Sequence, residues 1–315
     1  MKPFRYRAVP DVPAALSGGS RDGSKFIAGG TTLLDLWKLG AVAPDELLDI
    51  NSLPLAAIER SASGLRLGAL ARMSDVAAHP EVARDFPLIA TALLESASPQ
   101  IRNMASLGGN LLQRPRSSTY RGPDPHAVEP PGRGDAIFGV GPASAAPHPS
   151  DLAVALVALE ASLVLASPKG ERTVAVEEFY RLPGTTPDRL TALEQGELIT
   201  AIVVPERPWA RRSTYVKVRD RSSYQFALVS AAVALEVEAG SIKAARVAAG
   251  GVATRPWRLP RVEAALLGKP PVEASYQEAA KLAGDGAATH AANAYKVELL
   301  ERTVVRALAE LGGAE

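Results

Sequence analysis

Cysteine is absent from the 315-residue sequence. Without a thiol, the chain forms no disulfide bond, has no cysteine nucleophile, and cannot hold cysteine-ligated zinc or a conventional iron–sulfur cluster. The chain also lacks an excess of either charge, since 35 Lys and Arg residues are balanced by 34 Asp and Glu residues. The balance predicts neither a nucleic-acid partner nor binding to a membrane surface. No uncharged apolar run reaches the roughly 18 residues of a membrane-spanning helix, which indicates a soluble folded protein.

The composition is otherwise typical of a globular protein. Apolar residues make up 47% and charged residues 22% of the chain, close to ordinary globular averages. At roughly 150 residues per domain, the length predicts about two domains. The two prolines of Pro205–Pro208 can continue neither a helix nor a central strand. We therefore expect a domain boundary there, between 1–206 and 207–315.

Short strands and helices alternate in the first domain, which predicts an α+β fold. The expected strands are 25–28, 45–50, 65–70, 162–166 and 198–204. The expected helices are 31–39, 87–97 and 151–161. In the second domain we expect a strand at 214–219, a hairpin of 227–238 and 241–252, and then helices. The last helix carries an apolar stripe that would pack on a sheet or a partner: Val297, Leu300, Val304, Leu308 and Leu311.

A long segment between Gln113 and Pro149 is rich in proline and glycine and has few periodic apolar residues. A loop of this length without regular structure is unusual in a compact domain and usually has a function. The four histidines lack the i, i+4 spacing of a helical metal pair, so no metal site is predicted. They are His79, His126, His148 and His290.

Two glycine pairs lie where backbone amides could converge. Gly29-Gly30 follows a predicted strand and precedes a helix, and Gly108-Gly109 follows another helix. Glycine lets backbone N–H groups approach an anion without a side chain in the way, and a helix beginning at Thr31 adds its positive dipole end. Such turns bind phosphate oxygens, and a pyrophosphate would fit. Each pair taken alone is also typical of an ordinary tight turn.

Two segments around these glycines resemble FAD signatures of one family, the FAD-binding subunits of molybdenum hydroxylases. That group contains xanthine dehydrogenase, carbon monoxide dehydrogenase and aldehyde oxidoreductases. The segments are Phe26-Ile27-Ala28-Gly29-Gly30-Thr31-Thr32-Leu33-Leu34-Asp35-Leu36 and Asn103-Met104-Ala105-Ser106-Leu107-Gly108-Gly109-Asn110-Leu111. Two further family landmarks follow in the same order: Ser150-Asp151 at a helix start, and Lys217 on a strand. The resemblance covers nearly the whole chain. It is closest to the bacterial aldehyde oxidoreductase type, judged from 113–116, 148–151 and 216–224.

The resemblance implies a fold and a set of cofactor contacts. The first domain would be a two-lobed FAD-binding domain of the vanillyl-alcohol-oxidase type, with lobes of about 1–55 and 56–206, and the flavin would lie between it and a C-terminal sheet-and-helix domain. Main-chain amides would hold the pyrophosphate and ribityl chain: those of Ala28, Gly29, Gly30, Thr31, Thr32 and Leu33, and of Ser106, Leu107, Gly108, Gly109 and Asn110. Asp151 and Lys217 would face the flavin ring, the carboxylate accepting from the ring imide and the cation favouring reduced flavin. Ile199 would touch the ring, although it is also typical of strand core.

The implied function is the electron exit of a molybdenum hydroxylase. A large partner subunit would carry the molybdenum cofactor and a small one the two-iron clusters, and FAD on this chain would pass electrons to an external acceptor. In the aldehyde oxidoreductase type, the long loop carries cysteines that bind a four-iron cluster. Residues 116–147 have none here, so we expect no iron–sulfur cluster on this chain.

Two other functions remain open at this point. The chain would be a structural subunit if the glycine turns are remnants of a lost cofactor site, or a flavin oxidase that acts without partners. The residues Met1–Arg7 lack the apolar stretch of a secretory signal, which predicts the cytoplasm. The periplasm stays open if a partner carries the export signal.

Overall fold

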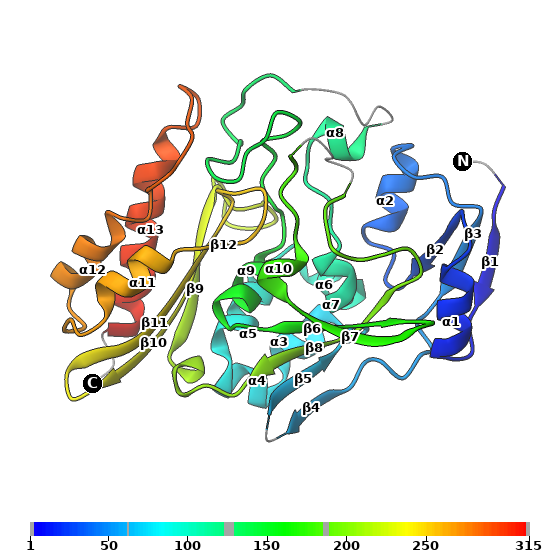
Figure 1. Cartoon of the computed structure of the whole chain (residues 1–315), viewed down its shortest axis with the longest axis horizontal. Coiled ribbons are helices and arrows are strands. Elements are labelled where there is room, and N and C mark those ends of the chain that lie inside the picture. The colour runs from blue at the N-terminus through cyan, green and yellow to red at the C-terminus, as the bar shows by residue number, and fades with distance from the viewer. Residues whose placement is uncertain (1–2, 62, 123–128, 185–188, 313–315) are drawn as a thin grey trace.

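The computed structural model describes residues 3–61, 63–122, 129–184 and 189–312. It confirms an α+β fold with three sheets, which Figure 1 shows in sequence from the N-terminal strands at one end to the C-terminal helices at the other. In the described parts of the chain, no helix combines the length and the apolar character needed to cross a bilayer.

The first lobe is a small parallel sheet with strand order β1-β3-β2. Its elements are β1 (Arg5–Ala8), α1 (Val12–Gly19), β2 (Ser24–Ile27), α2 (Leu33–Lys38) and β3 (Glu46–Asp49). Parallel strands need crossover connections, which α1 and α2 provide. The predicted helix at 31–39 begins only at Leu33, so the chain after β2 turns through an irregular segment before the helix starts.

The second lobe is an antiparallel sheet with strand order β4-β5-β8-β6-β7. Its strands are β4 (Ile58–Ser61), β5 (Gly64–Gly68), β6 (Ser162–Ser167), β7 (Gly170–Ala175) and β8 (Leu198–Pro205). Its helices are α3 (Met73–Ala78), α4 (Pro80–Asp85), α5 (Pro87–Leu94), α6 (Pro99–Met104), α7 (Leu107–Leu111), α8 (Ser118–Arg121), α9 (Asp151–Ala158) and α10 (Val176–Phe179). Every residue of α9 is buried, and Ser150 caps it by accepting the amide of Ala153 at 3.0 Å. This helix therefore lies at the centre of the molecule.

The third sheet has the order β12-β11-β10-β9 and is covered on both faces. Its elements are η1 (Pro208–Arg211), β9 (Ser213–Val218), β10 (Val229–Glu238), β11 (Ser241–Gly250), β12 (Trp257–Arg258), α11 (Pro260–Leu266), α12 (Glu273–Ala280) and α13 (Tyr295–Gly312). The predicted hairpin turns at Ala239 and Gly240, both with positive φ, as tight two-residue turns require. The third sheet lies between the helices of the second lobe and α11–α13 (Figure 1). Successive residues of β10 alternate between two cores, with Ala232 in the core that contains α5 and α9 and Val233 in the core that contains α11–α13. The apolar stripe of the last helix packs on this sheet, as predicted.

The Pro/Gly-rich segment is fastened to the C-terminal part of the chain. Residues 123–128, which include His126, lie outside the described residues. Further along, Phe138 stacks on Trp257 with ring centroids 5.3 Å apart. The buried ammonium group of Lys296, at the start of α13, donates to the carbonyls of Gly134 and Gly251, both at 2.7 Å. Burial lowers the pKa of Lys296 from 10.5 to about 8, because the interior disfavours its charged form.

The pH dependence of the variant Lys296→Met follows from this lowered pKa. Between pH 8 and 10.5 the unfolded chain binds more protons at Lys296 than the folded chain, so the contribution of Lys296 to stability rises with pH. We expect the destabilisation caused by Lys296→Met to grow by about 2 kcal/mol from pH 7 to pH 9.5, at 1.36 kcal/mol per pKa unit. Urea unfolding of both proteins at several pH values measures it. A difference that is constant with pH would contradict the burial of a charged lysine.

Candidate functional site

The first glycine segment, residues 28–33, connects β2 to α2 and leaves its amides free. Gly30 has a φ of +72°, which favours glycine. The carbonyls of Gly30 and Thr32 accept hydrogen bonds from the first residues of the helix. Within the residues that the structure describes, the amides from Gly29 to Leu33 donate to no acceptor. Consecutive free N–H groups at a bare glycine turn are a binding site for an anion.

The second glycine segment, residues 106–110, uses most of its amides within the protein. Leu107 donates to Ala71 at 3.0 Å, Gly108 to Ala69 at 2.8 Å, and Asn110 to the carbonyl of Ser106 at 2.9 Å. Gly109 is exposed, and its amide makes a long hydrogen bond of 3.3 Å to the Ser106 hydroxyl. The segment therefore presents a hydroxyl group and a glycine surface, whereas the resemblance implied that the main-chain amides from Ser106 to Asn110 help to hold the pyrophosphate and ribityl chain.

The two glycine segments touch each other. A Cβ on Gly29 would lie 1.8 Å from the carbonyl oxygen of Met104, so only glycine fits this contact. The guanidinium of Arg72 donates to the same carbonyl and, at 2.8 Å, to the side-chain oxygen of Asn51. Asn51 in turn donates to the carbonyl of Ala28 at 3.1 Å. These hydrogen bonds hold the first lobe against the second at the glycine turns.

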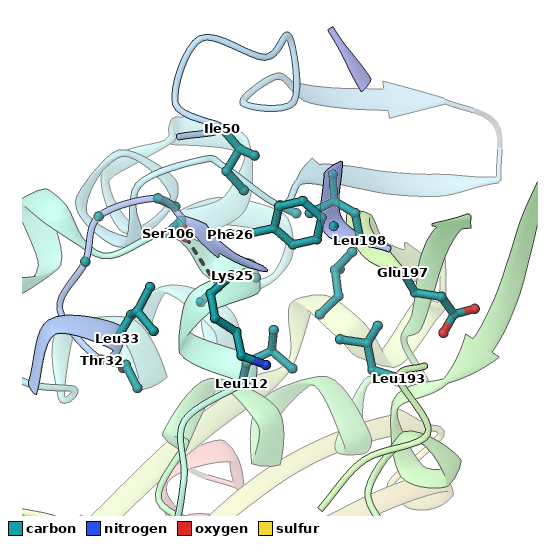
Figure 2. Close-up of a pocket in the computed structure, with 18 of the residues that line it drawn as sticks. Lys25, Phe26, Thr32, Leu33, Ile50, Ser106, Leu112, Leu193, Glu197 and Leu198 are labelled. Atoms are coloured by element: carbon teal, nitrogen blue, oxygen red, sulfur yellow. Dashed lines mark hydrogen bonds between the residues drawn. The ribbon is translucent and has the colours of Figure 1, made fainter. Parts of the chain in front are cut away.

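A cavity of about 430 Å³ lies between the lobes (Figure 2). Nine predicted residues of the two glycine segments line it, and Ile199 does so from β8: Ala28, Gly29, Gly30, Thr31, Thr32, Leu33, Ser106, Gly108, Gly109 and Ile199. Figure 2 also shows apolar side chains around it, including Phe26, Leu112, Leu193 and Leu198. Leu107 and Asn110 are buried and do not line the cavity. The arrangement combines an anion-binding turn with apolar walls, which suits a long ligand that carries phosphate and flat rings.

Asp151 and Lys217 lie together in a buried polar cluster outside this cavity. The Lys217 ammonium donates to Asp151 Oδ2 at 2.8 Å and to the carbonyl of Glu95 at 3.0 Å, and its side chain is only 1% exposed. The hydroxyl of Tyr215 donates to Asp151 Oδ1 at 2.7 Å, and the Ser96 hydroxyl lies 3.0 Å from Oδ2. Burial, followed by the charge of Asp151, raises the pKa of Tyr215 well above its usual value, so Tyr215 stays a hydroxyl donor.

One hydrogen bond links this cluster to the second glycine segment. The hydroxyl of Ser150 donates to the side-chain oxygen of Asn110 at 2.6 Å, while it also caps the helix that Asp151 begins. A second cavity of about 230 Å³ lies on this side, lined among others by Asp151, Tyr215 and Arg116. The cluster is therefore hydrogen-bonded to the second glycine segment, but its side chains do not line the main cavity.

Comparisons with known proteins identify the family of the chain. Residues 4–207 match the family model of the FAD binding domain in molybdopterin dehydrogenase, and residues 213–311 match the C-terminal domain of CO dehydrogenase flavoproteins. The chain belongs to this family of FAD-binding subunits. Family membership makes it an FAD-binding, electron-transferring oxidoreductase subunit of the molybdenum hydroxylase type, and confirms that prediction.

Relatives extend over essentially the whole chain. The sequence is 43% identical to the aldehyde oxidoreductase FAD-binding subunit PaoB of Escherichia coli, over 98% of both chains. It is 32% identical to the glyceraldehyde dehydrogenase medium chain of Sulfolobus acidocaldarius, over 84% of this chain and 82% of the relative. The carbon monoxide dehydrogenase of Hydrogenophaga pseudoflava has the same fold, with a TM-score of 0.77, 29% identity and 98% of each chain covered. Names such as medium chain indicate assemblies of several subunits.

Several residues of the cavity and of the polar cluster were not predicted from the sequence. Tyr215 precedes Lys217 by two residues on β9, so both point to the same face, and that spacing was the available signal. Arg114 and Lys25 line the main cavity but match neither signature. Among the described residues, no three His, Asp or Glu side chains gather closely enough to hold a metal ion.

The Gly29 contact predicts the effect of a single methyl group. In Gly29→Ala the new Cβ would overlap the Met104 carbonyl, so the two glycine segments must separate. We expect a loss of about 2 kcal/mol in the free energy of unfolding, as for other overpacked sites. Urea unfolding measures it, with Gly134→Ala as the matched control, because a Cβ there meets nothing within 4 Å. Equal stability of the two variants would show that the lobes do not need this contact.

Proposed function

We propose that the cavity between the two lobes binds FAD, with the diphosphate on the free amides from Gly29 to Leu33. The observation that carries this assignment is that run of N–H groups, which have no acceptor among the described residues and lie beside bare glycines, in a cavity of about 430 Å³. Ser106 and Gly109 would close the other side of the diphosphate, and Ile199 would contact the ring. In this assignment, residues 1–206 form the FAD-binding domain and 207–315 the C-terminal domain.

The bound FAD would accept and release electrons, and the chain's own residues would adjust its environment. Asp151 and Lys217 do not line this cavity, so they would act on the flavin ring from a distance, behind the second glycine segment to which the Ser150–Asn110 hydrogen bond joins them. Their ion pair is almost dry, so its charges act through a medium that screens them poorly. A cation held there favours the negative charge of a reduced flavin.

The proposed assembly contains a large molybdenum-cofactor subunit and a small subunit with two-iron clusters. The similarity to the aldehyde oxidoreductase subunit supports an aldehyde as the substrate class of that assembly. The external acceptor, for example NAD, a quinone, ferredoxin or dioxygen, receives the electrons from FAD. The cytoplasmic location, or the periplasm with a signal-bearing partner, stays a prediction.

The spectrum of the purified chain tests this function. We expect a yellow protein with about one FAD per chain, released on denaturation. A colourless chain that binds no added FAD would favour a structural subunit that has lost its cofactor. Bleaching of the flavin by an aldehyde added to the isolated chain would favour a flavin oxidase that acts without partners.

Gly109→Asp tests the position of the diphosphate. Gly109 is exposed, and a Cβ there meets only the Ser106 hydroxyl, at 3.0 Å, so the variant should fold. Its carboxylate would repel the diphosphate, and we expect FAD retention to be abolished. Absorbance at 450 nm with circular dichroism measures both properties, and Gly109→Ala separates bulk from charge. Stoichiometric FAD in the Asp variant would place the diphosphate elsewhere.

Lys217→Ala tests the role of the ion pair. We expect the variant to keep its flavin and its reduction potential to fall by roughly 50 mV, the order of one unit charge acting over about 14 Å at an effective dielectric constant near 20. Spectroelectrochemical titration measures the potential. Lys243→Ala, which removes the same charge from an exposed position on β11, is the control. Equal potentials in the two variants would leave Lys217 with only a structural role.

A further inference from the structure

Three arginines follow the second glycine segment, and one of them has no counter-ion among the residues that the structure describes. The guanidinium of Arg116 lies 3.7 Å from Asp35, and that of Arg121 contacts the same carboxylate. In the described ranges, no carboxylate lies within ion-pair distance of Arg114. Its only hydrogen bond in those ranges is to the carbonyl of Tyr120, at 3.2 Å, which orients the guanidinium without neutralising it.

The surroundings of Arg114 make an unpaired charge unfavourable. Its side chain is partly buried, and burial followed by the charge of Arg121 lowers its pKa. A cation removed from water and placed near a like charge requires a negative partner to offset the loss of solvation. Lys25, the other cation on the same cavity, is exposed and keeps its water. We therefore expect the partner of Arg114 to be an anion from outside the chain.

The position of Arg114 indicates which anion this is. Arg114 lines the same cavity as the free amides from Gly29 to Leu33. Arg121, its near neighbour, contacts Asp35, which lies two residues beyond that run of amides in α2. The guanidinium and the free amides thus line the same cavity, whereas Arg116 lines the second cavity.

We propose that Arg114 is the counter-ion of the FAD diphosphate and completes the anion site that the backbone amides begin. Guanidinium groups suit this task because their paired N–H donors match two phosphate oxygens. The inference rests on the proposed function and assigns to it a side chain outside both FAD signatures. It also supplies a counter-ion to a partly buried arginine that has no carboxylate partner in the described part of the chain.

Ligands that differ in phosphate content test this role on the full-length apoprotein. FAD and ADP carry the diphosphate, whereas riboflavin carries no phosphate. In Arg114→Gln we expect the dissociation constants of FAD and ADP to rise about tenfold to a hundredfold, the order of one charge-assisted hydrogen bond. The constant of riboflavin should stay unchanged. Flavin fluorescence quenching and competition by ADP measure them.

Two further variants serve as a control and as a conservative replacement. Arg116→Gln removes the same charge two residues away and should leave FAD affinity within about twofold of wild type, since Arg116 lines the other cavity. Arg114→Gln should lose both FAD affinity and the dependence of that affinity on salt concentration. Arg114→Lys keeps the positive charge and should recover part of both.

Several outcomes would overturn the assignment. Unchanged FAD affinity in Arg114→Gln would show that the arginine serves another anion, such as a carboxylate of a partner subunit. An equal loss for riboflavin and FAD would show that the residue only supports the fold. Failure of the wild-type chain to bind FAD would instead reject the proposed function itself. This outcome is distinct from failure of the Arg114 assignment, because it is measured on the unmutated protein.

Discussion

The close contact between Gly29 and the carbonyl of Met104 determines the geometry on which the site depends. It joins two lobes whose sheets share no strand, and it leaves no room for a side chain. Arg72 and Asn51 reinforce it with hydrogen bonds to the backbone on both sides. Because the contact uses the backbone itself, the free amides that follow Gly29 are held in place before any ligand arrives, and a preorganised site loses less entropy on binding.

The charged side chains around the cavity and the polar cluster differ in their exposure to water and in their partners. Asp151 and Lys217 are nearly dry and satisfy each other, with Tyr215 as a further donor. Arg116 and Arg121 share one exposed carboxylate. Arg114 alone among these arginines has no such partner in the described ranges. A buried pair is rigid and holds a constant field, whereas an unpaired cation that lines a cavity is available to a ligand.

Much of the fold was predictable because local periodicity reflects local structure. The hairpin around Gly240 and the apolar stripe from Leu300 to Leu311 were identified because turn chemistry and helical spacing act over a few residues. The helix expected from Thr31 starts at Leu33, because the glycine turn continues for two more residues. The order of the second sheet, with β8 between β5 and β6, depends on contacts between residues about 30 to 140 positions apart, which local patterns do not encode.

The sequence by itself excluded the chemistry of cysteine, because the chain contains none. It also determined the two glycine segments, which are typical of a flavoprotein family. Tertiary structure decided which of those amides remain free. The amides after Gly29 have no described acceptor, while those of Leu107 and Gly108 donate to Ala71 and Ala69. Backbone amides at the two glycine turns thus differ in role: those of the first can bind a ligand, and those of the second hold the fold together. The reason is that a backbone donor is available to a ligand only where no distant part of the chain supplies an acceptor.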